Sequence, residues 1–295
     1  MNISNKWIDY ECLKTGNGEK LERWGNIILN RPDPQIIWEK KDVWNNYDGY
    51  YHRSNEGGGY WEYKKKLPEY WTVKYNNLTF KVSPTNFKHT GIFPEQAANW
   101  DYIDFKVKEY LKDHEEMHIL NLFAYTGCAT MAAANAGATE VVHVDASKSI
   151  NEWAKENMKL NNITNVELIH ADGNTFRNNE EVDVVIFNPP YFKTPSSDKG
   201  SNKYLALAKH EDNFPLESMI QCVNRNLRNN GTLYFLFQTT RLNEVLKVLN
   251  EKKLVVKKMQ FVYDENKENS TVVMLKAVKG AKEGVLVQKP RYITR

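Results

Sequence analysis

An asparagine, two prolines and a tyrosine follow directly on a short apolar run. The run Asp183-Val-Val-Ile-Phe187 leads into Asn188-Pro189-Pro190-Tyr191, and proline, which has no N–H and a fixed φ, stops a strand there. The Asn188 amide is both an acceptor and a donor. With the Pro189 carbonyl and the Tyr191 ring, it could hold a planar base by its exocyclic amine. A strand merely stopped by prolines is an equally good interpretation of Pro-Pro alone.

Further polar residues follow three other expected strands. The segment 121–128, Asn-Leu-Phe-Ala-Tyr-Thr-Gly-Cys, leaves a strand and opens a helix, whose N-terminus could receive the polar end of a cofactor. Asp145 ends the next strand and could bind ribose hydroxyls, and Asp172 follows just after the one beyond it and could accept from an adenine amine. Each aspartate alone could instead cap a loop, but together they favour a nucleoside cofactor. The candidates are Asn121, Phe123, Tyr125, Thr126, Gly127, Asp145, Ala146, Asp172 and Asn188.

The elements that must position these residues alternate between strand and helix. Periodicity predicts strands over 118–123, 140–145, 166–170, 182–188 and 231–237, and helices over 94–111, 127–136, 147–160, 216–227 and 241–249. Two last strands, 254–263 and 270–278, are joined by the polar link 264–269, which predicts an antiparallel hairpin at the sheet edge. The fold expected is a doubly wound α/β sheet, Rossmann-like and of the class I methyltransferase type. Because no GxGxxG is present, dinucleotide binding is poorly supported.

The first part of the chain differs in character from the rest. Six of the eight tryptophans lie before residue 82, among short alternating segments separated by proline and glycine turns. We therefore expect a small β-rich domain over residues 1–82 and the methyltransferase domain over 83–295. The aromatic residues of the first domain are expected mainly in its core, because a small domain needs bulky side chains to bury enough surface.

Composition and charge narrow the class of protein. The chain has 41% hydrophobic residues, a formal net charge of +3 and no apolar run of about 18 residues, which predicts a protein without a membrane span. Three distant cysteines without a CxxC pair suit the cytoplasm and predict no structural metal. From Arg241 to Arg295 there are 13 Lys and Arg against 6 Asp and Glu. This basic segment could contact RNA phosphates or be an ordinary solvated surface.

The first half of the chain resembles a bacterial family related to the 23S rRNA methyltransferases. The segments that carry the resemblance are 16–24 (GNGEKLERW), 31–35 (RPDPQ), 87–97 (FKHTGIFPEQA), 121–127 (NLFAYTG) and 143–146 (HVDA). The resemblance implies S-adenosylmethionine as cofactor. It also implies that Thr90, Phe93 and Gln96 lie beside that cofactor.

The second half departs from that family, which usually has Asp-Pro-Pro where this chain has Asn188-Pro-Pro-Tyr191. From about Leu160 onward the chain is similar instead to the bacterial tRNA adenine-N6 methyltransferases that modify a tRNA-Val. The segments that match are 188–192 (NPPYF), 208–211 (AKHE), 261–263 (FVY) and 290–293 (PRYI). The two resemblances together imply an RNA substrate, either tRNA or rRNA.

Amine methylation suits these residues better than carbon methylation. C5-methylation of a pyrimidine needs a cysteine nucleophile, and the one cysteine after Pro190 is Cys222, expected in the middle of a helix. Methylating an amine needs only positioning, which we assign to Asn188, Pro189 and Tyr191. We therefore expect methyl transfer to an exocyclic amine in RNA, foremost adenine N6. The alternatives are guanine N2 of rRNA, a protein glutamine, and an inactive RNA-binding module that keeps the cofactor pocket.

Overall fold

The computed structural model describes residues 6–54, 58–85, 88–189 and 215–293. The chain forms two compact units, which are residues 4–97 and 98–294. Residues 83–97, which the sequence assigned to the second domain, belong to the N-terminal unit. Each unit is described by itself.

The N-terminal unit is built from a five-stranded sheet and a separate hairpin. The sheet has the order β1 (Tyr10–Gly16), β2 (Glu19–Trp24), β3 (Ile27–Pro32), β4 (Gly49–Arg53) and β5 (Gly59–Tyr63), and the hairpin is β6 (Trp71–Tyr75) with β7 (Leu78–Val82). Neighbouring strands are antiparallel except β3 and β4. Left-handed Asn17 and Gly18 (φ 49° and 74°) turn β1 into β2, which is the backbone that tight hairpins require. Trp24 and Trp44 are buried in the core, whereas Trp7, Trp38, Trp61 and Trp71 are only partly buried.

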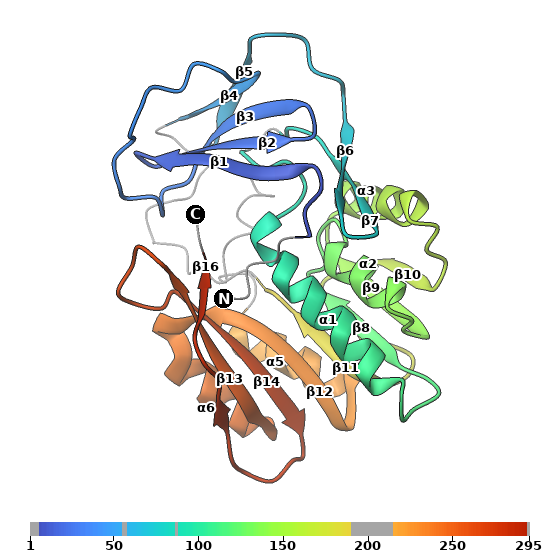
Figure 1. The fold of residues 1–295 in the computed structure, drawn as a ribbon. Helices are drawn as coiled ribbons and strands as arrows, with labels where there is room; N and C mark the ends of the chain where they lie inside the picture. Colours follow the sequence, from blue (N-terminus) through green and yellow to red (C-terminus); the bar gives the residue numbers. More distant parts are fainter. Residues whose placement is uncertain (1–5, 55–57, 86–87, 190–214, 294–295) are drawn as a thin grey trace. The chain divides into compact units, whose positions relative to one another are not determined.

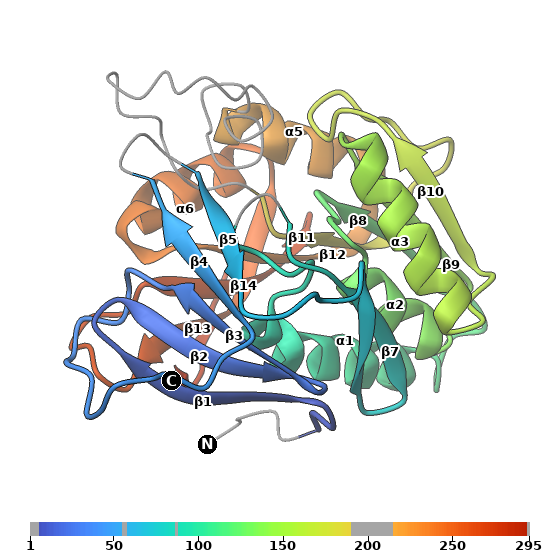
Figure 2. The same ribbon diagram turned by 90° about the horizontal axis from the view of Figure 1, so that it is seen from above.

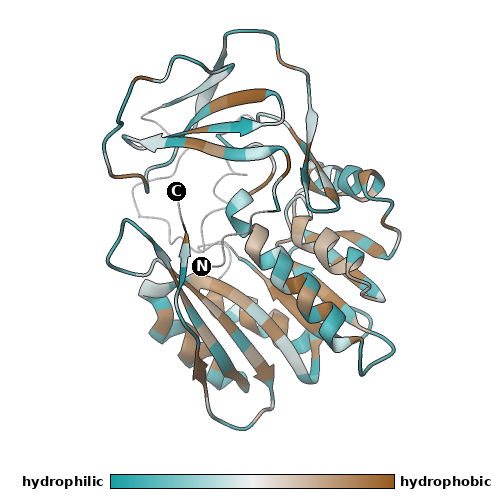
Figure 3. Cartoon of the chain, in the orientation of Figure 1, coloured by the Kyte–Doolittle hydropathy of each residue, from teal (hydrophilic) through white to brown (hydrophobic). Residues whose placement is uncertain are grey.

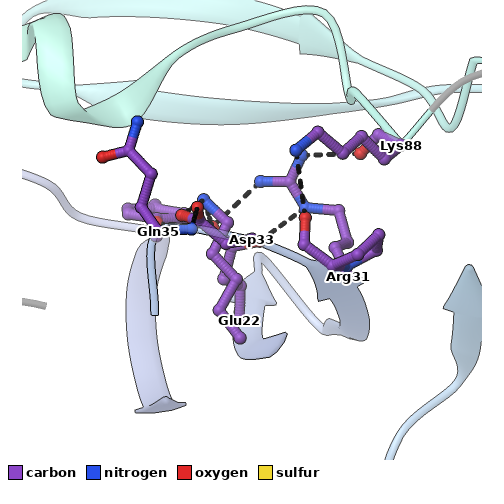
Figure 4. Close-up of polar contacts among 8 residues, drawn as sticks. Glu22, Arg31, Asp33, Gln35 and Lys88 are labelled. Atoms are coloured by element: carbon purple, nitrogen blue, oxygen red, sulfur yellow. Dashed lines mark hydrogen bonds and ion pairs between the residues drawn. The ribbon is translucent and has the colours of Figure 1, made fainter. Parts of the chain in front are cut away.

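An ion pair lies inside this unit, as Figure 4 shows. Glu22 and Arg31 are 0% and 3% exposed, and the guanidinium of Arg31 meets the carboxylate with Nε–Oε2 and Nη2–Oε1 distances of 2.6 and 2.9 Å. Tyr10 donates to the same carboxylate at 2.7 Å, and Arg31 Nη1 donates to the Lys88 carbonyl at 2.8 Å. The pair thereby ties β2 and β3 to the segment that follows β7.

The charges of this pair depend on each other. Burial opposes ionisation of Glu22, but the charges of Arg31 and Lys20 outweigh it and lower the pKa of Glu22 to about 2. Two buried charges of this kind are costly to desolvate and are stable only together. Asp33, two residues after Arg31, accepts a hydrogen bond from the backbone N–H of Gln35 at 3.2 Å in a local turn. The segment Arg31-Pro-Asp-Pro-Gln35 therefore has a structural role within its own unit.

The C-terminal unit contains a nine-stranded sheet. Its order is β10 (Val166–His170), β9 (Glu140–Asp145), β8 (His118–Leu122), β11 (Val182–Phe187), β12 (Leu227–Gln238), β14 (Val272–Lys279), β13 (Leu254–Asp264) and β15 (Leu286–Val287), with β16 (Arg291–Ile293) also on β13. The first five strands are parallel, and β14 is antiparallel to both of its neighbours. This arrangement confirms the predicted Rossmann-like sheet with an antiparallel hairpin.

Helices cover both faces of this sheet. They are α1 (Ala97–Tyr110), α2 (Cys128–Asn135), α3 (Lys148–Leu160), α5 (Leu216–Asn226) and α6 (Leu242–Glu251). Figures 1 and 2 show α1 and α2 on one face and α5 and α6 on the other. All six residues of β11 are buried, as expected for a central strand covered on both faces. In Figure 3 the central strands of the sheet are coloured mainly as hydrophobic, whereas α1 alternates between hydrophilic and hydrophobic residues.

Two details differ from the expected elements. The hairpin does not form the sheet edge, because β15 and β16 pair with β13 on its outer side. Strand β12 begins at Leu227 rather than at Gly231, with an irregular register in which Val182 pairs with Leu227 and Val184 with Thr232. Short strands such as β15 lack enough alternation to be seen in the sequence. No helix in the described part of the chain is long and apolar enough to cross a membrane.

We expect Arg31→Met to destabilise the protein by about 3–5 kcal/mol, because it leaves the Glu22 carboxylate buried without a counter-charge. The free energy of unfolding can be measured in denaturant by tryptophan fluorescence. Arg23→Met is the matched control, since Arg23 pairs with Glu11 at 3.0 Å on the surface and its loss should cost at most about 1 kcal/mol. Equal losses in both variants would contradict the role given to the pair.

The free energy of unfolding should also decrease in acid, because Glu22 becomes protonated. Because its pKa is lowered to about 2 in the folded protein, the folded state binds fewer protons than the unfolded state between the usual glutamate pKa and about pH 2. The stabilisation, about 3 kcal/mol by linkage, is complete above that window and is lost as the pH falls through it. The free energy of unfolding of the double variant Glu22→Met/Arg31→Met should depend less on pH over the same window.

Candidate functional site

Four parallel strands of the C-terminal unit end in line. Leu122 pairs with Val144 on one side and with Phe187 on the other, and Asp145 pairs with His170. The segments that follow these strands therefore leave the sheet at one edge. That edge, at the carboxyl ends of the strands, is where open α/β sheets bind ligands.

The loop between β8 and α2 has an unusual backbone. Phe123 and Tyr125 are left-handed with φ of 54° and 52°, and Gly127 has φ 87°. For residues with a Cβ this conformation costs about 1–3 kcal/mol each and often marks functional sites. The loop is held by the Tyr125 amide, which donates to Asp145 Oδ2 at 2.9 Å, and by Asn157 Nδ2, which donates to the Thr126 carbonyl at 2.8 Å. The surrounding structure thus compensates for the strain.

Asp145 occupies the corner between the loop and α3. Its two carboxylate oxygens accept the Tyr125 and Ser147 amides, both at 2.9 Å, and burial raises its pKa against these hydrogen bonds. Each oxygen keeps a further lone pair, so the carboxylate can still accept ligand hydroxyls. Ala146, next in the chain, is exposed, and its carbonyl lies 3.0 Å from His170 Nε2.

Other candidates of the loop face the interior. Asn121 is 3% exposed and donates to Thr130 Oγ1 of α2 at 2.9 Å, and Thr126 is fully buried. A Cβ on Gly127 would lie 3.3 Å from Ala154 Cβ and 3.4 Å from His143 Cε1. Gly127 therefore allows close packing inside the unit as well as a left-handed turn. The side chains of Asn121 and Thr126 lie inside the unit and support the loop from within, and contact of these residues with a cofactor stays a prediction.

The segment after β10 forms a turn over the same edge. Asp172 is exposed, and its Oδ1 accepts a hydrogen bond from the backbone N–H of Asn174 at 2.8 Å. This is the loop-capping arrangement that the sequence also allowed. Gly173, which the sequence analysis missed, meets the Phe123 ring: a Cβ there would lie 2.9 Å from Phe123 Cζ. The Asp172-Gly173 dipeptide directly after a strand is a turn signal, and it could have identified Gly173 from the sequence. Helix α5 anchors this turn, because Arg225 Nε donates to the Phe176 carbonyl at 2.9 Å.

The predicted base-binding residues follow β11. Asn188 is exposed at the end of this buried strand, and Pro189 is buried. The Phe187 ring below them meets the Phe123 ring edge to face at 5.7 Å, so the segments after β8 and β11 rest on one aromatic pair. Tyr191 and Pro190 lie outside the described residues, and the role of Tyr191 stays a prediction.

Thr90, Phe93 and Gln96 belong to the N-terminal unit. Thr90 is fully buried, and its hydroxyl has no hydrogen-bond partner among the residues that the structure describes. The ring centroids of Phe93 and His89 are 5.2 Å apart, and the backbone N–H of Gln96 donates to the Phe93 carbonyl at 2.9 Å. Their contact with a cofactor stays a prediction.

Cys128 and Cys222 are unsuited to nucleophilic attack. Burial raises the pKa of Cys128, the first residue of α2, to about 12. Burial also raises the pKa of Cys222 in α5, whose Sγ donates to the Phe176 carbonyl at 3.3 Å, and Cys12 lies on β1 of the N-terminal unit. A thiol needs a lowered pKa to react near neutral pH. In the described ranges no cluster of three His, Cys, Asp or Glu side chains could hold a metal.

Comparisons with known proteins agree with this fold. Residues 104–222 match the family described as Conserved hypothetical protein 95. A large-subunit ribosomal RNA methyltransferase K/L of Pseudoalteromonas atlantica is 36% identical over 132 residues, covering 44% of this chain and 17% of the relative. The protein of the same name from Magnetococcus marinus is 28% identical over 219 residues, covering 70% and 26%. The chain thus spans less than a third of either relative.

A solved structure matches over nearly its whole length. The crystal structure of an S-adenosylmethionine-dependent methyltransferase from Agrobacterium tumefaciens is 27% identical, with a TM-score of 0.73, over 93% of this chain and 91% of that one. The chain therefore has the class I S-adenosylmethionine-dependent methyltransferase fold, with a β-rich N-terminal part, as predicted from its sequence.

We expect Asp145→Asn to weaken S-adenosylmethionine binding by roughly 10- to 100-fold, because hydrogen bonds to a charged acceptor contribute about 1.5–3 kcal/mol. The dissociation constant can be measured by calorimetry. Asp104→Asn, which alters a surface aspartate paired with Lys108 in α1, is the matched control and should bind as the unaltered protein does. Unchanged affinity in Asp145→Asn would exclude Asp145 as a cofactor ligand.

Proposed function

We propose that this chain is an S-adenosylmethionine-dependent methyltransferase that methylates an exocyclic amine of a base in RNA, specifically adenine N6. The observation that carries the proposal is the exposed position of Asn188 at the end of β11. This residue follows directly on Phe187, whose strand neighbour Leu122 opens the strained loop of β8. A base held by Asn188 would therefore lie next to a cofactor held by that loop.

The residues at this edge suit the cofactor. Asp145 has lone pairs left for ribose hydroxyls, and its position at the end of β9 is the usual one for binding them. Asp172, exposed above the turn that covers Phe123, can accept from the adenine amine. The cofactor supplies an activated methyl group on a sulfonium.

The role of the chain in the reaction is positioning. Asn188 Oδ1 and the Pro189 carbonyl accept the amine hydrogens and turn the nitrogen lone pair toward the methyl carbon. A nitrogen–carbon bond forms as the sulfur–carbon bond breaks, and one amine proton passes to solvent. Such alignment can supply roughly 7–11 kcal/mol of the barrier. The raised pKa values of Cys128 and Cys222 are consistent with a route that needs no covalent intermediate.

An RNA substrate is supported by the names of the relatives and by charge. Lys258 and Lys276 stand directly opposite each other on β13 and β14. Burial lowers the pKa of Lys276, Lys106 and Lys258 lower it further, and Glu109, which is paired with Lys106, opposes them, so three lysines and one glutamate gather on one side of the C-terminal unit. Like charges in cross-strand pairs are unfavourable by themselves, and a phosphate backbone would relieve them. A cytoplasmic location, where RNA is at hand, belongs to the same proposal.

The test is transfer of radiolabelled methyl groups to total bacterial RNA, followed by nucleoside analysis. We expect labelled N6-methyladenosine, and a fall in kcat of about 100-fold in Asn188→Ala, comparable to the loss of one aligned polar group in other enzymes. Cofactor affinity should be preserved in this variant. Asn229→Ala, at an exposed asparagine of β12, is the matched control and should remain active.

Other outcomes would redirect the assignment. Label in N2-methylguanosine would keep the mechanism and change the base, and label in protein glutamine would replace the RNA substrate. Label in 5-methylcytosine would contradict the amine mechanism. Cofactor binding without transfer to RNA or protein would favour an inactive RNA-binding module.

A further inference from the structure

A chain of buried polar side chains crosses the sheet beneath the strained loop. It begins at Asn121 of β8, whose Nδ2 donates to Thr130 Oγ1 at 2.9 Å, and Thr130 Oγ1 in turn lies 2.9 Å from His143 Nδ1 of β9. His143 is 0% exposed and Asn151 of α3 is 7% exposed. Asn151 reaches the Asp145 carbonyl at the ligand-binding edge, and His143, Thr130 and Asn151 were not among the candidate residues of the sequence.

The first two contacts determine which nitrogen of His143 carries the proton. Thr130 Oγ1 accepts from Asn121, and its own hydrogen has no acceptor other than His143 Nδ1 among the residues that the structure describes. If Nδ1 carried the proton, the buried hydroxyl hydrogen would be left without an acceptor, which is costly. Nδ1 is therefore the acceptor, and in a neutral ring the proton lies on Nε2.

Two hydrogen-bond acceptors, on Asn151 and Tyr125, act on the His143 ring. Burial lowers the pKa of His143 to about 4, while the Asn151 side chain and the Tyr125 backbone oppose this change. Hydrogen-bond acceptors have this effect on a histidine, so the Asn151 amide oxygen and the Tyr125 carbonyl lie beside the ring. Asn151 Oδ1 and His143 Nε2 are both buried, and neither has a hydrogen-bond partner among the residues that the structure describes. A small rotation of either side chain would pair this buried donor with this buried acceptor.

The far end of this series of polar side chains reaches Asp145, at the corner between the loop and α3. Asn151 Nδ2 donates to the Asp145 carbonyl at 3.0 Å, and the Asp145 carboxylate accepts the Tyr125 amide at 2.9 Å. Tyr125 is one of the left-handed residues of the loop, with φ 52°. Its amide is therefore held by Asp145, and its backbone raises the pKa of His143 against the effect of burial. The imidazole also packs under Gly127, the last residue of the loop.

We propose that His143 is a positioning residue, which as the neutral Nε2–H tautomer holds Tyr125 and Asp145 in the arrangement that binds the cofactor. Asn121 and Thr130 set its tautomer from one side, and Asn151 receives its proton on the other. The hydrogen bonds thus run in one direction, from β8 to the carboxyl end of β9. The inference rests on the proposed function only in taking S-adenosylmethionine as the ligand of the loop.

The tautomer can be read directly by nitrogen NMR of histidine-labelled protein near neutral pH. Thr130 contacts His143 Nδ1, so the histidine Nδ1 signal that shifts in a Thr130 variant assigns His143 among the seven histidines. We expect a pyridine-type Nδ1 and a pyrrole-type Nε2 that carries the proton. A proton on Nδ1 would overturn the proposal, and this measurement does not depend on whether the protein is a methyltransferase.

A pair of variants at Thr130 tests the consequence for binding. Thr130→Val keeps the shape and removes the hydroxyl, and it should weaken S-adenosylmethionine binding by about 10-fold, with little change of kcat at saturating cofactor. Thr130→Ser restores the hydroxyl and should recover most of the affinity. Equal affinity in the two variants, at a temperature where both are folded, would overturn the positioning role. Failure of the unaltered protein to bind S-adenosylmethionine would instead contradict the proposed function, while the tautomer result stood by itself.

Discussion

The common register of the parallel strands β8, β9, β10 and β11 is the constraint on which the rest of the site depends. Leu122, Val144 and Phe187 lie side by side in the sheet, and His170 lies beside Asp145. Because a strand that slips by one residue turns every side chain to the other face, this register places Asp145 and Asn188 at one edge. The fully buried β11 makes the register strict, since any slip would expose or bury the wrong residues.

Polar contacts then convert this edge into a site with a defined backbone. The left-handed conformations of Phe123 and Tyr125 are unfavourable by themselves, and the loop is held by Asp145 at the Tyr125 amide and by Asn157 at the Thr126 carbonyl. The interior beneath is also polar, with Asn121, Thr130 and His143 in contact. A polar network under a ligand loop specifies one arrangement more sharply than an apolar layer would.

Several residues of recognisable motifs have structural roles. Arg31 of the Arg-Pro-Asp-Pro segment belongs to a buried ion pair with Glu22, and Gly127 allows packing against Ala154 and His143. Asp172 closes its own turn through the Asn174 amide. A motif shared with a family thus combines residues that could meet a ligand with residues that form the loop presenting it. Residue types alone do not separate the two, because both need polar or small side chains at strand ends.

The sequence by itself determined the order of strands and helices, the class of fold and the segments at the strand ends. Hydrophobic periodicity and proline stops are local, so they can be read along the chain. Only the tertiary structure decided that Asn121 and Thr126 face inward, that Gly173 lies against Phe123, and that β15 and β16 extend the sheet beyond β13. These features depend on contacts between residues far apart in the chain. Such contacts are set by packing and register, which no short segment encodes.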